Sequence, residues 1–328
     1  MIDTSGDRPP MQSDSQDFDL ARAKVCVVMN RGSGKKKHQE LRALLEERLA
    51  PACGHYELRE SRKGSDLPAL ARRVAGEGFD LVIAAGGDGT QSAVAGALTG
   101  SETVMGVLPG GTFNYFARDL GVGETIEDAL DTILDARVET ADVGDVNGLI
   151  FLNNVSLGAY PQILKTREGI YRRWGRSRIA AYWSVLVALR RLRRPMQLVA
   201  RVDGQESRYT SALVFVARSA YQLDSFGLEG AEEIRRGEFA VLIAKAKRPL
   251  PLMRSALRMA MGKSAKDDDF DLILTDSLTI ETPKPRQLVA HDGEKTTLES
   301  PFRFEVRHDR LRVLLPRDGT DKTDRPEA

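Results

Sequence analysis

The sequence of 328 residues predicts an α/β domain followed by an antiparallel β domain. In the first half of the chain, short apolar runs alternate with stretches whose leucines recur at helical spacing. This alternation is typical of a parallel sheet covered by helices on both faces. From about Val143 onward, the chain consists of short strand-like runs separated by turns. The length also suits two domains of roughly 100–200 residues each.

The α/β half is predicted element by element from its apolar pattern. Leu41, Leu44, Leu45 and Leu49 fall on one face of a helix, and Pro68 is acceptable in the first turn of another. The predicted strands are residues 24–29, 55–58, 79–85 and 103–108. The predicted helices are residues 39–49, 67–77, 91–98 and 124–136.

The β half is predicted from strand-like runs and from two dipeptides typical of tight hairpins, Asp203-Gly204 and Asp292-Gly293. The predicted strands are residues 146–153, 196–202, 208–217, 238–246, 270–281, 287–290, 302–307 and 310–315. The predicted helices that interrupt them are residues 176–194 and 250–262. The expected domains are residues 22–142 and 143–317, between disordered polar tails at 1–21 and 318–328.

Composition excludes several classes of protein. Lys and Arg number 48 against 47 Asp and Glu, for a net charge of +1, so the chain is not a uniformly basic nucleic-acid binder. Two cysteines, Cys26 and Cys53, can form neither a disulfide scaffold nor a zinc site. No apolar run reaches the roughly 18 residues of a transmembrane helix, and the polar N-terminus lacks the apolar core of a signal peptide. We therefore expect a cytoplasmic protein with no transmembrane segment and no nucleic-acid partner.

A glycine-rich loop, residues 86–90 (GGDGT), directly follows a predicted buried strand. Its glycines, Gly86, Gly87 and Gly89, allow backbone N–H groups to approach a phosphate, and the following helix N-terminus favours negative charge. Asp88 can hold Mg²⁺ or accept a proton. The structural alternative is a tight turn with a capping Asp.

Two further loops lie at the same edge of the predicted sheet, where ligands bind in such folds. In residues 108–114, Gly110 and Gly111 offer backbone donors and Thr112 and Asn114 offer polar side chains; the alternative is a helix start capped by Thr112. Residues 30–37 (NRGSGKKK) suit phosphate contact but lack Walker A spacing, so a solvated turn is an equal alternative.

Other familiar chemistries find no support. A GxGxxG fingerprint is missing after the first strand, which counts against a standard NAD-dependent dehydrogenase. The four histidines form neither a Ser-His-Asp pattern nor a metal pair. Asp292 and Glu294 share one turn (DGE) and are candidate acid–base groups, with a plain hairpin as the alternative.

At these loops the chain resembles the diacylglycerol kinase catalytic-domain family, soluble bacterial lipid kinases related to sphingosine and ceramide kinases and distantly to NAD kinases. Residues 86–90 and 108–121 (LPGGTFNYFARDLG) look like its two nucleotide loops, and residues 30–34 are similar to its Asn-Pro-x-Ser-Gly loop, with Arg31 in place of Pro. The likeness extends over about residues 24–316. Its further segments are residues 142–147, 151–158, 292–294 and 302–315.

The resemblance implies a three-layer nucleotide-binding domain, a C-terminal β-sandwich and an active site in the cleft between them, where ATP and lipid meet. The residues implied to contact ATP are Asn30, Ser33, Gly34, Ser61, Gly86, Gly87, Asp88, Gly89, Thr90 and Thr112. It also implies that Asp88, or the pair Asp292 and Glu294, activates the lipid hydroxyl, and that Asp88 serves Mg²⁺. Phosphoryl transfer needs such positioning, Mg²⁺ and one carboxylate base. The choice between Asp292 and Glu294 stays open.

Two departures from the family pattern stand out. Gln91-Ser92 replaces the Asn-Glu that often follows the first glycine loop, so a polar contact near the nucleotide is lost or replaced. Arg236-Gly237 replaces an Asp-Gly pair that helps to hold a structural Mg²⁺ in some bacterial members. We therefore expect this second metal site to be absent.

Residues 165–194 combine ten basic residues and one acidic residue with four interleaved aromatic side chains. An apolar stripe at helical spacing includes Ile179, Trp183 and Leu186. This composition suits transient contact with the inner face of an anionic membrane. The equal alternative is a core-facing helix with solvated arginines.

The sequence thus predicts an ATP- and Mg²⁺-dependent lipid kinase, with diacylglycerol as the first candidate acceptor, giving phosphatidic acid. The alternatives are an NAD kinase-like enzyme that phosphorylates a soluble nucleotide, and a non-catalytic nucleotide- or membrane-binding regulator. A homodimer is compatible with the sequence, which does not fix the oligomeric state.

Overall fold

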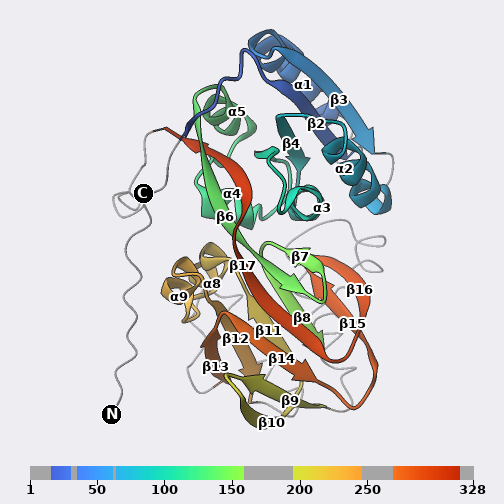
Figure 1. The fold of residues 1–328 in the computed structure, drawn as a ribbon, viewed down its shortest axis with the longest axis vertical. Coiled ribbons are helices and arrows are strands. Elements are labelled where there is room, and N and C mark those ends of the chain that lie inside the picture. The colour runs from blue at the N-terminus through green and yellow to red at the C-terminus, as the bar shows by residue number, and fades with distance from the viewer. Residues whose placement is uncertain (1–15, 31–34, 62–63, 159–194, 246–268, 318–328) are drawn as a thin grey trace.

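The computed structural model describes residues 16–30, 35–61, 64–158, 195–245 and 269–317. Its first half contains four parallel strands in the order β5-β4-β2-β3 (Figure 1). Their bounds are β2 Lys24–Asn30, β3 His55–Ser61, β4 Leu81–Gly86 and β5 Val104–Pro109. Because β4 and β5 are buried almost throughout, their sequences are continuous apolar runs, as in sheets covered on both faces.

Helices cover both faces of this sheet and form two separate cores. One face packs against α2 (Leu67–Ala75), α3 (Asp88–Leu98) and α4 (Tyr115–Leu120). The other packs against α5 (Ile126–Leu134) and η2 (Leu45–Leu49), the π-helical continuation of α1 (Lys35–Leu44). Short 3₁₀ turns are η3 (Ala50–Ala52) and η4 (Gly64–Asp66). The predicted helix–sheet–helix layering is confirmed.

The second half is antiparallel. A six-stranded sheet runs in the order β13-β12-β11-β8-β15-β16. Its strands are β8 Asn154–Gly158, β11 Leu213–Ala217, β12 Phe239–Ala244, β13 Phe270–Thr275, β15 Arg286–His291 and β16 Glu294–Glu299. It faces β9 Met196–Val202, β14 Ser277–Glu281 and β17 Phe302–Pro316 across a shared apolar core, and β10 Gln205–Ser211 pairs with β9. The predicted antiparallel β domain is therefore confirmed.

Two long strands join the halves (Figure 1). β17 pairs with β14 through residues 302–305, and its Val313 lies beside Met105 of β5 in parallel register. β6 (Ala136–Val146) runs antiparallel to β17 along nearly its whole length. β6 also pairs with β1 (Gln16–Asp17) and β7 (Leu149–Phe151). The end of the chain thus completes the first sheet, and the domain boundary at residues 142 and 143 stays a prediction.

Two short helices, α8 (Ala220–Phe226) and α9 (Ala231–Arg235), pack on the outer face of β11 and β12. Ser219 caps α8 by accepting a hydrogen bond from the N–H of Gln222 at 3.1 Å. The sequence pattern did not predict either helix, because helices of 7 and 5 residues are shorter than the window of roughly 11–18 residues over which helical periodicity is recognised. Figure 1 shows both beside the junction of the two halves.

The strand predicted at residues 146–153 is only partly right, because within this range only Val146 and Leu149–Phe151 are strand. Asn147 and Gly148 adopt positive φ angles of 53° and 82° and form a two-residue turn between β6 and β7. The predicted helices at residues 176–194 and 250–262 lie outside the described residues. Among the helices that the structure describes, none is long and apolar enough to cross a membrane.

Candidate active site

The two glycine loops pack backbone to backbone where β4 and β5 end. Gly110 N–H donates to the carbonyl of Gly86 at 3.0 Å, and a Cβ atom at Gly111 would lie 2.7 Å from the Cα of Gly87. A Cβ atom at Gly86 would lie 2.5 Å from Oγ1 of Thr90. Side chains at these positions would push the loops apart, so the glycines are required by close packing.

The second loop is closed by its own asparagine. Asn114 has a left-handed φ of 51°; its Oδ1 accepts from Gly111 N–H at 2.8 Å and its Nδ2 donates to the Gly111 carbonyl at 3.2 Å. Asn114 is also the residue before α4, so Thr112 does not occupy the capping position. Gly110, Gly111 and Thr112 are exposed at the sheet edge, but the N–H groups of Gly110 and Gly111 are used within the loops.

Asp88 begins α3 and reaches across to the second loop. Its carboxylate accepts hydrogen bonds from the backbone N–H groups of Asn114 at 3.2 Å and Tyr115 at 2.9 Å. It also accepts from Nδ2 of Asn153 at 3.3 Å. Burial, and secondly the negative charge of Asp292, raise the pKa of Asp88, while the two backbone donors partly oppose the shift.

This pKa shift predicts how stability depends on pH. The raised pKa means that folded protein holds the Asp88 proton more tightly than unfolded protein does. The stabilisation by this proton is therefore present below the ordinary value of 3.8 and is lost as pH rises through the raised value. In urea unfolding of metal-free protein with chelator, we expect the wild type to lose free energy of unfolding relative to Asp88→Asn across that window. If the difference in free energy of unfolding between wild type and Asp88→Asn stays constant with pH, the pKa of Asp88 is not raised in the folded protein.

Asp292 lies in the turn between β15 and β16, with its residue only 4% exposed. Its Oδ2 accepts from the N–H of Leu152 at 2.8 Å, and its Oδ1 accepts from the N–H groups of Asn153 at 2.8 Å and Asn154 at 3.1 Å. The predicted hairpin is confirmed, with φ angles of 43° at Asp292 and 83° at Gly293. The turn thus also holds the segment that enters β8.

Asn153 connects the two aspartates and was not predicted from the sequence. Its backbone N–H donates to Asp292 and its side-chain amide donates to Asp88. The residue is 1% exposed, and its Oδ1 has no hydrogen-bond partner among the described residues. The only sequence signal is the polar pair Asn153-Asn154 at the start of an otherwise apolar strand.

Glu294, in contrast, is exposed. A Cβ atom at Gly89 would lie 3.2 Å from Oε1 of Glu294, so this side chain borders the first glycine loop. The structure therefore brings Asp88, Asp292 and Glu294 together from two distant parts of the chain. Asp292 faces backbone donors, whereas Glu294 faces the loop and solvent.

The remaining predicted nucleotide contacts lie at the ends of neighbouring strands. Asn30 ends β2 and Ser61 ends β3, and the two residues are directly opposite in parallel register. Ser61 and Thr90 are buried, with 3% and 5% exposure. Ser33 and Gly34 lie outside the described residues. Gln91 is fully buried, and its Nε2 donates to the Gly86 carbonyl at 3.1 Å, so here the departure from the family pattern serves the first loop.

The residues near Arg236-Gly237 do not fit a second metal ion. A Cβ atom at Gly237 would lie 3.2 Å from Oδ2 of Asp142, but this carboxylate already accepts from the Arg218 guanidinium at 3.0 Å. Arg218 also donates to the Ile234 carbonyl at 3.0 Å. The guanidinium of Arg218 therefore binds the Asp142 carboxylate and the Ile234 carbonyl, the oxygen ligands that a metal ion would need here.

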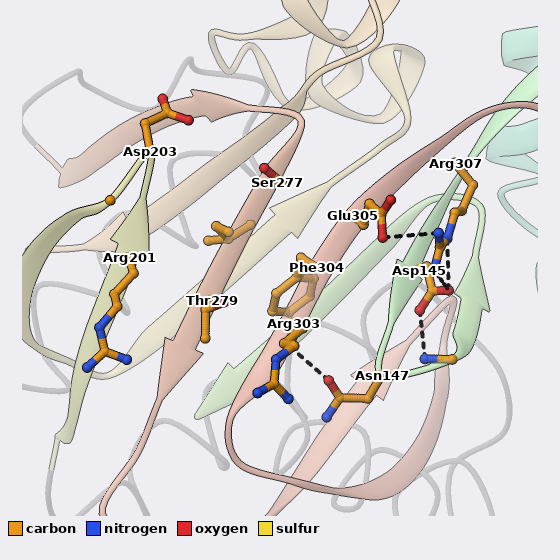
Figure 2. Close-up of a pocket in the computed structure, with 13 residues that line it drawn as sticks. Asp145, Asn147, Arg201, Asp203, Ser277, Thr279, Arg303, Phe304, Glu305 and Arg307 are labelled. Carbon is orange, nitrogen blue, oxygen red and sulfur yellow. Dashed lines mark hydrogen bonds and ion pairs between the residues drawn. The ribbon is translucent and has the colours of Figure 1, made fainter.

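A cavity of about 570 Å³ lies elsewhere, on the outer surface of β6, β9, β14 and β17 (Figure 2). Its three arginines are Arg201, Arg303 and Arg307, and acidic side chains are interspersed with them. Asp145, for example, pairs with Arg307 at 3.2 Å. None of the lining residues belongs to the candidate active site.

Comparison with known proteins agrees with this architecture. The family model described as diacylglycerol kinase catalytic domain matches residues 24–146. The model described as YegS C-terminal NAD kinase beta sandwich-like domain matches residues 163–315. Together these two matches span most of the chain.

Similar proteins include the diacylglycerol kinase of Bacillus subtilis, 26% identical over 91% of this chain and 98% of that protein. A diacylglycerol kinase of Staphylococcus aureus is 31% identical over 43% of this chain and 46% of its own length. The crystal structure of a diacylglycerol kinase from Bacillus anthracis has a TM-score of 0.65 at 21% identity, over 90% of this chain and 97% of that one, and so shares the fold. The chain belongs to the diacylglycerol kinase catalytic-domain family, joined to the YegS-type β-sandwich domain.

Proposed function

We propose that the protein is an ATP-dependent lipid kinase that transfers the γ-phosphoryl group of ATP to the hydroxyl of diacylglycerol, giving phosphatidic acid. The observation that carries this proposal is the meeting of Asp88, on a glycine loop, with Asp292, on the β-sandwich, through Asn153. Phosphoryl transfer requires a phosphate cradle beside a carboxylate that can accept the acceptor's proton. The names of the relatives support the same reaction class.

The nucleotide side of the site is built by the strand ends. Backbone N–H groups of Gly87 and Gly89 would cradle phosphates, helped by the N-terminus of α3. Gly110 and Gly111 would line the phosphate site through their lack of side chains, because their own N–H groups already donate to Gly86 and Asn114. Asn30, Ser61, Thr112 and Asn114 would add polar contacts, with Ser33 and Gly34 as further proposed contacts.

The oxygen donors around Asp88 fit Mg²⁺. Within the described ranges, no three His, Cys, Asp or Glu side chains converge into a metal site. A lone carboxylate suits Mg²⁺, which commonly binds through one or two carboxylates plus substrate phosphates. Asp88 would hold the ion, with the buried Oδ1 of Asn153 beside it. Bound there, Mg²⁺ would neutralise charge on the phosphates.

We assign Asp292 as the general base. It accepts three backbone hydrogen bonds, which use three of the roughly four lone-pair positions of a carboxylate and fix its orientation. One position is left to take the proton of the lipid hydroxyl. Glu294, exposed beside Gly89, would help to place the nucleotide loop.

Contact with a bilayer is part of this proposal. A diacylglycerol kinase must reach its acceptor in a membrane, and residues 165–194 carry the basic and aromatic composition suited to an anionic surface. That segment lies outside the described residues. A cytoplasmic enzyme that visits the inner face of the membrane is thus the expected form.

A panel of acceptors tests the proposal. Purified protein with radiolabelled ATP and Mg²⁺ should label diacylglycerol in mixed micelles, in preference to sphingosine, ceramide and NAD. Labelling of NAD alone would instead support the soluble-nucleotide alternative, consistent with the NAD kinase-like description of the second domain. ATP binding without labelling of any acceptor would support a non-catalytic regulator.

A further inference from the structure

Four aromatic side chains form a continuous row between the second glycine loop and α8. The rings of Phe113 and Tyr115 are stacked, with centroids 5.3 Å apart and planes within 6°. The Tyr115 ring lies 6.5 Å from that of Tyr221 and 6.4 Å from that of Phe226. We call these four residues the aromatic row.

The row begins at the candidate site. Tyr115, which carries the second ring of the row, donates its backbone N–H to Oδ1 of Asp88 at 2.9 Å. In the sheet, β4 separates β5 from β2 and β3. The aromatic row follows β5, whereas Asn30 and Ser61 end β2 and β3. The row is therefore separated from Asn30 and Ser61 by the width of β4, although Thr112 and Asn114, which flank Phe113, are predicted nucleotide contacts on the β5 side.

Contacts between α4 and α8 hold the inner end of the row. Arg118 donates to the hydroxyl of Tyr221 at 2.6 Å, and its guanidinium carbon lies 5.2 Å from the Tyr221 ring centroid. Asp119 accepts from the N–H of Tyr221 at 2.8 Å and from the hydroxyl of Ser219. The inner rings are thus preorganised, which is the usual condition for a specific binding surface.

The outer end of the row is open. Phe113 is 50% exposed, the highest exposure among the large hydrophobic residues that the structure describes. Arg118, at the inner end, is paired with Glu124 at 2.8 Å. The row thus offers a ligand an apolar surface next to the phosphotransfer centre. Apolar chains bind such a surface, because burying it removes both from water.

We propose that the aromatic row is the acceptor subsite and binds the first methylene groups of the lipid's acyl chains, next to the hydroxyl that is phosphorylated. This inference rests on the proposed lipid kinase function. It adds that the acceptor is recognised by its chains near the reacting hydroxyl, on the β5 side of Asp88.

Replacement of Phe113 tests the subsite. With diacylglycerol in mixed micelles, Phe113→Ala should raise the KM for the lipid by about tenfold, because the exposed half of the Phe113 ring would no longer contact the acyl chains. The KM for ATP should stay at the wild-type value. Phe113→Leu should recover part of the loss. Leu274→Ala is the matched control, because Leu274 is also exposed, at 38%, but belongs to β13 and is not one of the four rings of the row.

The outcomes separate this inference from the proposed function. If wild-type protein labels no lipid, both fall. If wild-type protein labels diacylglycerol and Phe113→Ala leaves the KM for lipid unchanged, only the acceptor subsite is overturned. If Phe113→Ala raises the KM for ATP and leaves the KM for lipid unchanged, the row contacts the nucleotide, and the acceptor-subsite proposal is again overturned.

Discussion

Asp292→Asn is expected to lower the turnover of lipid phosphorylation by about 10²–10⁴-fold, the usual contribution of a general base. The substitution keeps the size of the side chain but removes its basic carboxylate. The KM for ATP should change little, because the predicted nucleotide contacts lie on the first domain. Initial rates with diacylglycerol micelles at varied ATP and lipid measure both effects.

Two controls separate catalysis from folding. In Asp292→Asn, the NH₂ group of the amide replaces one carboxylate oxygen and faces at least one backbone N–H that donates to Asp292 in the wild type. Because this lost hydrogen bond can destabilise the fold, the thermal midpoint must be measured beside the rate. Glu294→Gln leaves the same turn in place at an exposed position, and should cost less than about tenfold in rate. If Glu294→Gln loses as much activity as Asp292→Asn while both remain folded, the base is Glu294. The general-base assignment would then be wrong.

The parallel half of the fold could be predicted because its strands are buried on both faces. Such strands are unbroken apolar runs, and the expected strands at residues 24–29 and 103–108 differ from β2 and β5 by a single residue at the ends. The glycine loops that follow them were predictable as ligand loops because parallel strands end at one edge of the sheet.

The antiparallel half was harder because its strands are divided by single residues or turns that hardly interrupt the apolar pattern. The predicted strand at residues 208–217 is two strands, β10 and β11, separated at Ala212. Conversely, the two predicted strands at residues 302–307 and 310–315 are one, β17, with a register shift between Arg307 and Leu311. The Asn-Gly turn at 147–148 carried a strong hairpin signal that the surrounding apolar residues outweighed.

Asn153 and the aromatic row could not be found from sequence because they depend on long-range contacts. Asn153 lies 65 residues from Asp88 and 139 from Asp292 along the chain. Tyr115 and Tyr221 are likewise brought together only by the packing of α4 against α8. No local periodicity reports such a meeting.

The buried Arg218 carries the second large prediction. Its guanidinium joins Asp142 of β6 to the Ile234 carbonyl of α9, and Asp142 also accepts from the N–H of Asp309 at 2.9 Å. The backbone N–H of Arg218 donates to the Asn153 carbonyl at 2.8 Å, directly behind the two aspartates. The Arg218 side chain is 11% exposed, and this burial lowers its pKa despite the opposing charge of Asp142.

Arg218→Met is expected to lower the free energy of unfolding by about 3 kcal/mol, because it leaves the largely buried Asp142 carboxylate with only His308 and the backbone N–H of Asp309 as partners among the described residues. Urea unfolding measures this loss. Arg235→Met, which breaks the half-exposed pair with Asp224, is the matched control and should cost no more than about 1 kcal/mol. Because a guanidinium occupies this position, EDTA should leave the thermal midpoint of the nucleotide-free wild type unchanged. A midpoint that falls with EDTA would show that a metal ion holds this junction. An Arg218→Met loss no larger than that of Arg235→Met would show that Arg218 does not hold it.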